Sequence, residues 1–259
     1  LNRLLDIMVR LRDPVRGCPW DVKQTFKTIA PFTIEEAYEV IDAIDKGDLT
    51  ALREELGDLL FQVVFHSRIA EEAGHFDFDA VAQTVSEKMV HRHPHVFGGE
   101  TMTSLSAQMV QWETQKEKER EANATAKGKK GSALDGIPKI LPALTYANKI
   151  SHRAARTGFD WPNTKDVFLK IFEELEELQI AINGETAEQI HEEIGDLLFT
   201  VCCLARHIGV NPESSLRAAT SKFERRFREV EESYVREGLD MSNASLENME
   251  TRWQKIKKN

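Results

Sequence analysis

An internal duplication constrains the fold of this chain more than any other feature. Two blocks recur at an offset of 138 residues, EEAYEVIDAI at 35–44 as EELEELQIAI at 173–182 and EELGDLLF at 54–61 as EEIGDLLF at 192–199. The four tryptophans pair at an offset of 141 residues, Trp20 with Trp161 and Trp112 with Trp253. Matches that keep their spacing indicate two copies of one structural unit. We therefore expect an N-terminal domain at 1–118 and a C-terminal domain at 141–259.

The stretch between the copies, residues 119–140, has a different composition. It is rich in Ala, Lys and Gly, and it lacks apolar periodicity. Such a segment has no apolar face to bury, which predicts a flexible linker. Its lysines could also bind phosphate, but a solvated linker is the simpler interpretation.

Composition and charge exclude several classes of protein. The 259 residues carry a formal net charge of −9, so the chain is a poor general binder of nucleic acid. No apolar run reaches the roughly 18–20 residues of a membrane span, and no signal-peptide pattern is present. The three cysteines lack zinc-site spacing and suit buried thiols in a reducing compartment. We expect a cytoplasmic protein that contacts neither membranes nor nucleic acids.

Apolar residues recur at helical spacing in both copies, and no segment alternates as a strand would. The helices expected are 1–12, 33–45, 49–73, 77–92 and 104–118, then 141–157, 163–183, 186–208, 213–236 and 244–257. Asp48 is the expected N-cap of the third helix, and Pro31 should stand near the start of the second. The predicted fold class is all-α, with a helical bundle in each copy.

Gly57 and its counterpart Gly195 lie in the middle of predicted helices. A glycine at such a position costs about 1 kcal/mol relative to alanine. Its repetition in both copies predicts that another helix approaches closely at this point.

Two helices of each copy carry acidic residues in pairs three apart, which places each pair on one helix face. The pairs are Glu36 with Glu39 and Glu55 with Asp58, then Glu174 with Glu177 and Glu193 with Asp196. Like charges about 4 Å apart repel by about 1 kcal/mol in water and about 4 kcal/mol at a protein-like dielectric. An isolated pair is more often a solvated helix face, but the repetition favours a divalent-cation site. An all-oxygen donor set suits Mg²⁺ or Mn²⁺ rather than zinc.

Basic residues of the second copy are candidates for binding phosphate. Lys222 and Arg226 lie one turn apart with Arg225 between them, and Trp253 and Lys257 form a similar pair. Two other interpretations stay open, a charge-mixed surface helix for the first group and a core tryptophan with an exposed lysine for the second. The histidines of HRHPHVF at 91–97 and the CPW segment at 18–20 predict a helix end and a loop rather than a metal site or a nucleophile.

With these motifs the sequence resembles the MazG family of nucleoside triphosphate pyrophosphohydrolases, in particular its two-repeat bacterial members. The resemblance rests on E-x-x-E followed by E-x-x-D in both copies, and on GCPWD and HRHPHVF. It implies an all-α fold and homodimerisation that assembles a four-helix catalytic unit. It also implies Mg²⁺-dependent hydrolysis of nucleoside triphosphates to monophosphate and pyrophosphate. Specificity would be broad over canonical triphosphates, with non-canonical ones as candidates and Mn²⁺ as a substitute metal.

The resemblance also assigns roles to residues of the C-terminal copy, which is expected to be catalytic. The metal ligands would be Glu174, Glu177, Glu193 and Asp196, with Glu36, Glu39, Glu55 and Asp58 as a second candidate set in a structural or dimerising N-terminal copy. The nucleotide would be surrounded by Lys170, Lys222, Arg225, Arg226, Trp253 and Lys257, matched in the first copy by Lys88, Arg92, Trp112 and Lys116. The two copies differ at one point of this set: the second copy has an additional arginine, Arg225, directly before Arg226, whereas Val90 and His91 precede Arg92 in the first copy.

The hypothesised mechanism is attack on phosphorus by a water whose pKa the metal lowers, with Glu173, Glu192 or Glu193 as catalytic carboxylates. Two other hypotheses stay open. One is a narrower enzyme, such as a phosphoribosyl-ATP or dUTP/dCTP hydrolase on a related bundle. The other is a non-catalytic helical interaction protein that retains an acidic patch.

Overall fold

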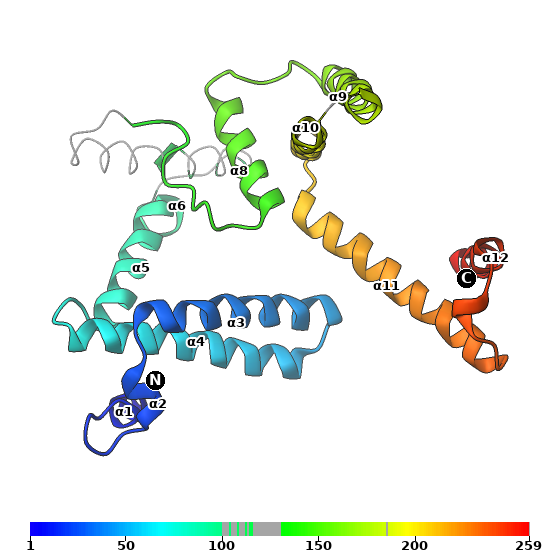
Figure 1. Cartoon of the computed structure of the whole chain (residues 1–259). Coiled ribbons are helices and arrows are strands. Elements are labelled where there is room, and N and C mark those ends of the chain that lie inside the picture. Colours follow the sequence, from blue (N-terminus) through cyan, green and yellow to red (C-terminus); the bar gives the residue numbers. More distant parts are fainter. Residues whose placement is uncertain are drawn as a thin grey trace. The chain divides into compact units, whose positions relative to one another are not determined.

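The computed structural model describes residues 1–99, 104, 108, 112, 114–115, 131–184 and 186–258. These residues form helices and loops without any strand, which confirms the predicted all-α class. The chain divides into two compact units, Leu1–Lys116 and Glu117–Asn259 (Figure 1). None of the described helices combines the length and the apolar character that a membrane crossing requires.

Three predictions fall wholly or mostly outside the described residues: the helix at 104–118, Lys116, and the linker as far as residue 130. The last part of the predicted linker, 131–140, is described and forms turns. The guanidinium of Arg153 donates hydrogen bonds to the carbonyl oxygens of Ala133 and Asp135, at 3.0 and 2.8 Å. This end of the segment is therefore held against the helix that carries Arg153.

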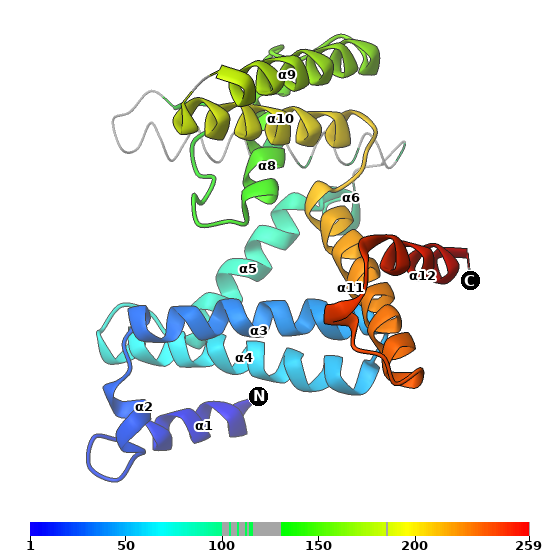
Figure 2. The same cartoon turned by 45° about the vertical axis from the view of Figure 1, so that its right-hand side comes forward.

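The first unit is built around a pair of antiparallel helices. Its helices are α1 (Asn2–Leu11), α2 (Pro19–Lys23), α3 (Phe26–Lys46), α4 (Leu49–Glu72), α5 (Phe78–Arg92) and α6 (Pro94–Phe97). Helices α3 and α4 lie side by side in both views (Figures 1 and 2). Gly47, at φ +69°, ends α3, and the carboxylate of Asp48 accepts hydrogen bonds from the backbone of Thr50 and Ala51. The predicted cap of α4 is thereby confirmed, and the tight turn fixes the hairpin.

The predicted start of the second helix is wrong, because α3 begins at Phe26 and Pro31 lies inside it. The reason is a capping box. Thr25 and Thr28 exchange hydrogen bonds between each side chain and the other residue's backbone N–H, which satisfies the first donors of the helix. This stabilisation offsets the hydrogen bond that the proline removes. The CPW segment, predicted as a loop, contains the start of α2 at Pro19.

The core of the first unit joins α1, α3 and α4. Its buried members are Met8, Ile29, Val64, Phe65 and Ile69, with Leu4, Leu5, Phe61 and Phe78 packed around them. Arg12 links three elements, because it donates to the Glu72 carboxylate of α4 and to the carbonyl oxygen of Asp21 in α2, both at 2.6 Å.

The second unit repeats the hairpin. Its helices are α8 (Ala143–Arg156), α9 (Thr164–Gly184), α10 (Ala187–His207), α11 (Pro212–Arg236) and α12 (Leu246–Lys258), with a 3₁₀ turn at Met241–Asn243. A capping box between Thr186 and Gln189 starts α10. Helix α10 packs on α9 and α8, and α12 packs on α11 (Figure 2). Cys202 and Cys203 are buried in α10, as the sequence predicted.

The close helix approach predicted at Gly57 and Gly195 is wrong within this chain. A Cβ added to either glycine meets no heavy atom within 4 Å among the described residues. The same two helices expose an equivalent apolar stripe in each unit. Its members are 36–52% exposed: Leu56, Leu60 and Val63 on α4, and Ile194, Leu198 and Val201 on α10. Each hairpin therefore leaves an apolar stripe uncovered, and its members lie between the acidic residues in the sequence of the same helix.

Candidate functional site

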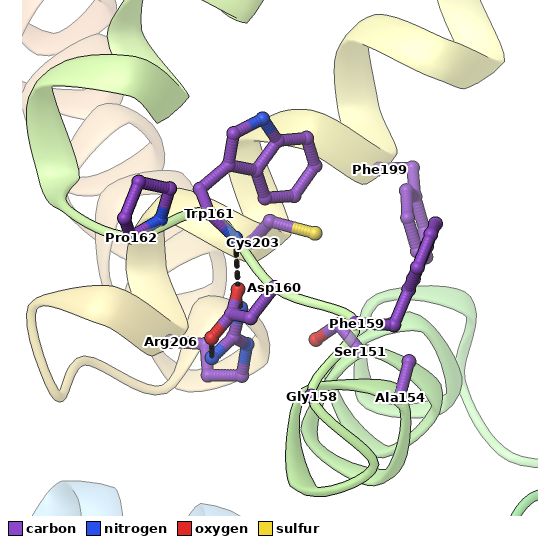
Figure 3. A pocket seen from close by; sticks show the side chains of 10 residues that line it. All are labelled: Ser151, Ala154, Gly158, Phe159, Asp160, Trp161, Pro162, Phe199, Cys203 and Arg206. Atoms are coloured by element: carbon purple, nitrogen blue, oxygen red, sulfur yellow. Dashed lines mark hydrogen bonds and ion pairs between the residues drawn. The ribbon is translucent and has the colours of Figure 1, made fainter.

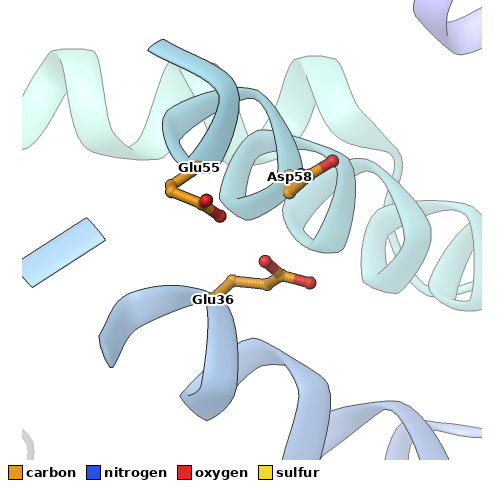
Figure 4. A group of neighbouring side chains, drawn as sticks. All are labelled: Glu36, Glu55 and Asp58. Atoms are coloured by element: carbon orange, nitrogen blue, oxygen red, sulfur yellow. The ribbon is translucent and has the colours of Figure 1, made fainter. Parts of the chain in front are cut away.

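Each helical hairpin brings three carboxylates together. In the first unit they are Glu36 of α3 and Glu55 and Asp58 of α4, and Figure 4 shows Glu36 reaching from its helix toward the other two. In the second unit they are Glu174, Glu177 and Glu193. Within each trio the ligand atoms all lie within 4.8 Å of one another. Among the described residues, the clusters with metal-ligand spacing contain carboxylates only, and none contains a histidine of HRHPHVF.

The fourth predicted acid of each set lies beside the trio. In the first unit, burial raises the pKa of Glu36 and Glu55, and the negative charges of Asp58 and Glu39 raise both further. In the second unit, burial raises the pKa of Glu193, and Glu177, Glu174 and Asp196 add to the rise. Glu39 and Asp196 are therefore near enough to act on the trios electrostatically, and Glu39 is within hydrogen-bonding reach of both Glu36 and Glu55.

A lysine distinguishes the second cluster from the first. The Nζ atom of Lys170 lies 2.9 Å from Oε1 of Glu174 and 4.0 Å from Oε2 of Glu177. It also donates to Oε1 of Glu173 at 2.7 Å. Glu173 and Glu174 raise the pKa of Lys170 well above its usual value, so its ammonium group stays charged at neutral pH.

The first unit has no such cation at the equivalent position. At the offset of 138 residues, Lys170 corresponds to Phe32, whose ring packs edge-on against Trp20 with centroids 6.0 Å apart. The buried acid also differs, since Glu174 is 4% exposed whereas Glu36 is only partly buried. The two trios share two equivalent acids, Glu36 with Glu174 and Glu55 with Glu193, and they differ in the third acid and in charge balance.

The other two predicted catalytic carboxylates flank the second cluster. Glu173 and Glu192 are both exposed, one residue before Glu174 and Glu193 respectively. Glu173 is engaged by Lys170. Glu192 is close enough to Glu193 to contribute to its raised pKa. Of the two, Glu192 is the one whose carboxylate has no hydrogen-bond or ion-pair partner among the described residues.

Comparison with known proteins decides the family. Two segments, residues 24–97 and 163–231, match the MazG nucleotide pyrophosphohydrolase domain, so both hairpins lie within matched segments. The chain belongs to the MazG family. Its relatives include the nucleoside triphosphate pyrophosphohydrolase of Escherichia coli K12, 48% identical over 100% of this chain and 97% of that protein. They also include the nucleoside triphosphate pyrophosphohydrolase/pyrophosphatase MazG of Thermotoga maritima, 44% identical over 99% of this chain and 95% of that protein.

A crystal structure of a MazG-related protein from Thermotoga maritima also resembles part of this MazG chain. It is 33% identical and covers 45% of this chain and 99% of that one, with a TM-score of 0.39.

The basic and aromatic residues predicted on the last two helices of this MazG chain form a group of their own. Trp253 of α12 packs against Phe223 of α11 with ring centroids 5.2 Å apart. The guanidinium of Arg225 pairs with Glu229 at 2.9 Å, in the charge-mixed surface that was the alternative interpretation. Lys222 and Lys257 are exposed, and Arg226 is half-buried. Of the six predicted nucleotide-binding residues, the described part of the chain therefore places only Lys170 in contact with the acidic trio.

Sequence reasoning missed a pocket of about 360 Å³ in the second MazG domain (Figure 3). Asp160 lies in its wall, where it accepts hydrogen bonds from Arg206 at 2.8 Å and pairs with His207 at 2.9 Å. The Arg206 hydrogen bonds lower the pKa of Asp160 to about 2, against the opposing effect of burial. The only sequence signal was the pairing of Trp161 with Trp20, because the pocket forms where residues 151–162 meet Phe199, Cys203 and Arg206 of α10, a contact between separate segments.

Proposed function

We propose that the chain hydrolyses nucleoside triphosphates to nucleoside monophosphate and pyrophosphate at the acidic cluster of its C-terminal domain. The observation that carries this proposal is the convergence of Glu174, Glu177 and Glu193, with the charged ammonium group of Lys170 beside Glu174. Carboxylates and a fixed cation are what a site needs to hold a metal–polyphosphate complex. The printed names of the Escherichia coli and Thermotoga maritima relatives support the same activity.

The donor set fits a divalent cation, with Mg²⁺ as the first candidate and Mn²⁺ as a substitute. The cluster offers only carboxylate oxygens, and burial and then the negative charges of Glu177, Glu174 and Asp196 raise the pKa of Glu193. Glu174, Glu177, Glu193 and the neighbouring Asp196 would hold the cation. When bound, it supplies positive charge for the phosphate oxygens and makes the attacking water more acidic.

The chain's own residues attract the phosphates, orient the ligand carboxylates and accept the proton of the attacking water. Lys170 presents a permanent positive charge beside the cluster, where it attracts the phosphates and holds Glu174 in place. Glu174 is almost fully buried, so its carboxylate is fixed in direction. We propose that Glu192 is the general base that accepts the proton of the attacking water, because Glu173 is already paired with Lys170.

The N-terminal domain is proposed to be structural. It keeps the four acids, but Phe32 stands where Lys170 is needed, and Val90 and His91 stand where the second domain has an additional arginine before Arg226. At the position equivalent to Lys170, its trio therefore lacks the positive charge that would attract a polyphosphate.

A homodimer is proposed to complete the catalytic unit. The stripes defined by Leu56, Leu60 and Val63 and by Ile194, Leu198 and Val201 are uncovered in the described part of one chain. Exposed apolar area at equivalent helix positions in both domains favours packing against a second hairpin, which makes a four-helix bundle. Gly57 and Gly195, with open space beside them, would allow that hairpin to approach closely.

Product analysis tests the proposed activity. The chain is incubated with Mg²⁺ and each common and deaminated triphosphate, and the products are separated. Monophosphate and pyrophosphate in equal amounts from most triphosphates support the proposal, whereas diphosphate and phosphate contradict it. Turnover of a single triphosphate favours the narrower enzyme. No turnover, together with no coupled binding of Mg²⁺ and a non-hydrolysable triphosphate, favours the interaction protein.

A further inference from the structure

One arginine joins the last two helices of the C-terminal domain. The side chain of Arg252 in α12 is 14% exposed, and its guanidinium lies over the ring of Tyr234 in α11, 4.1 Å from the ring centroid. Its Nη1 and Nη2 atoms donate to the two carboxylate oxygens of Glu237, at 2.8 and 2.5 Å. Nη1 also donates to Oγ of Ser233 at 3.0 Å, and Nε donates to Oδ1 of Asn248 at 3.1 Å. These five residues, the Arg252 clamp, all follow residue 231, where the match to the MazG domain ends.

The clamp and a second contact together fix the direction of α12. The ring of Trp253, the residue after Arg252, packs against Phe223 of α11. Phe223 lies ten residues before Ser233, which is about 15 Å along a helix. Two attachment points that far apart determine how one helix is oriented on another, whereas a single point allows the helix to swing. Without the clamp, the hydrogen bond from the Tyr234 hydroxyl to Asn248, at 2.8 Å, would still hold α12 against α11.

The orientation of α12 decides which charges surround Trp253. Lys222 and Arg226 flank Phe223 on α11, one residue before it and three residues after it, and Lys257 lies one turn after Trp253 on α12. None of these three cations has a carboxylate partner among the described residues. Their positive charge is therefore available to an anionic substrate.

Other arginines of α11 are neutralised within the helix. Arg225 pairs with Glu229 at 2.9 Å, and Arg228 pairs with Glu224 at 2.5 Å, each one turn apart. The charge-mixed surface of α11 thus balances these arginines and leaves the cations beside Trp253 unbalanced.

We propose that Arg252 is a positioning residue for triphosphate hydrolysis, an inference that rests on the proposed function. It holds α12 so that Trp253 and Lys257 stand with Lys222 and Arg226 on one surface, where the ring and the three charges bind the anionic substrate. Arg252 acts through these residues rather than on the substrate, because four of its five N–H donors are already used within the clamp.

The test measures KM and kcat for ATP with Mg²⁺ by pyrophosphate release. Arg252→Met removes the hydrogen bonds of the guanidinium, and KM should rise about fivefold or more while kcat stays within about twofold, because contacts outside the acidic trio contribute to binding. Arg228→Met is the matched control, since it also removes an arginine that pairs with a glutamate, but one outside the clamp. Its KM should stay within about twofold of the wild type.

A double-mutant cycle separates positioning from a general loss of stability. Trp253→Ala already removes the second attachment point, so adding Arg252→Met to it should raise KM by less than about twofold. Glu237→Ala is a second way to open the clamp, and it should raise KM at least about twofold even if Arg252→Met does not fold.

Three results overturn the positioning role alone while the wild type hydrolyses ATP. They are an unchanged KM in Arg252→Met or in Glu237→Ala, a loss confined to kcat, and an equal rise in KM with and without Trp253. A wild-type chain that hydrolyses no triphosphate overturns the proposed function and this inference with it.

Discussion

The Nζ atom of Lys170 lies 2.9 Å from Oε1 of Glu174, one helical turn away on α9. This ion pair places a cation beside the acidic trio of the C-terminal domain, and the corresponding residue of the N-terminal domain is Phe32. The two domains therefore present similar carboxylates with different charge balance. This difference gives a structural reason to assign the chemistry to one of them.

Replacing Lys170 with Met is expected to lower kcat/KM for ATP at least tenfold. The ammonium group makes charge-assisted contacts, each typically contributing about 1.5–3 kcal/mol, and its loss also increases the repulsion that phosphates meet. Steady-state kinetics of pyrophosphate release measure the effect. Phe32→Met is the matched control in the first domain, with an expected change below twofold. Equal effects of the two substitutions would contradict the special role of the lysine.

Asp160→Asn is expected to destabilise the fold in a pH-dependent manner. The pKa of Asp160 is lowered from 3.8 to about 2, so its carboxylate stabilises the folded state at pH values above about 4. This contribution is about 1–2 kcal/mol after allowance for solvent screening, and it decreases as the pH falls toward 2. Urea unfolding should show the full difference from wild type at pH 7 and about half of it at pH 3.

Asp6→Asn, at an exposed position of α1, is the control for this series and should change the free energy of unfolding little at either pH. A difference between Asp160→Asn and wild type that stays constant from pH 7 to pH 3 would show that the Asp160 carboxylate does not stabilise the fold through its charge.

Leu198→Asp and Leu60→Asp are expected to weaken self-association about tenfold or more. Both leucines lie in the exposed apolar stripes, and a charge placed in an apolar interface loses its hydration without a partner. Sedimentation equilibrium gives the dissociation constant. Val235→Asp changes a more exposed side chain on α11 and should leave association unaltered. A wild-type chain that is monomeric at micromolar concentration contradicts the proposed dimer.

Local signals in the sequence predicted much of the fold. The Asp48 cap and the apolar spacing of 49–73 predicted helix α4 of the hairpin, because each signal acts within a few residues. Pro31 misled the prediction of the helix start, since the capping box at Thr25 outweighs it. Gly57 predicts close helix packing, which the described residues of one chain do not show.

The candidate site was predictable to a smaller extent. The carboxylates were found because spacing on a helix determines which residues share a face, and the repeat marked the same rows twice. The grouping of Trp253 with Phe223 and the pocket beside Cys203 depend on contacts between distant segments. Such contacts leave no periodic trace in one sequence. The contrast between Lys170 and Phe32 was visible in the alignment of the repeats, but its meaning needed the distance to Glu174.

The most direct test of the central claim is pyrophosphate release by Glu193→Gln and Glu55→Gln, compared with wild type under the same Mg²⁺ and ATP concentrations. These residues occupy equivalent positions in the two acidic trios. Glu193→Gln should lower turnover at least a hundredfold, with an unchanged helical circular dichroism spectrum, because it removes a ligand of the cation. Glu55→Gln should stay within twofold of the wild type. Wild-type turnover in Glu193→Gln, or an equal loss in Glu55→Gln, would contradict the assignment of catalysis to the C-terminal domain.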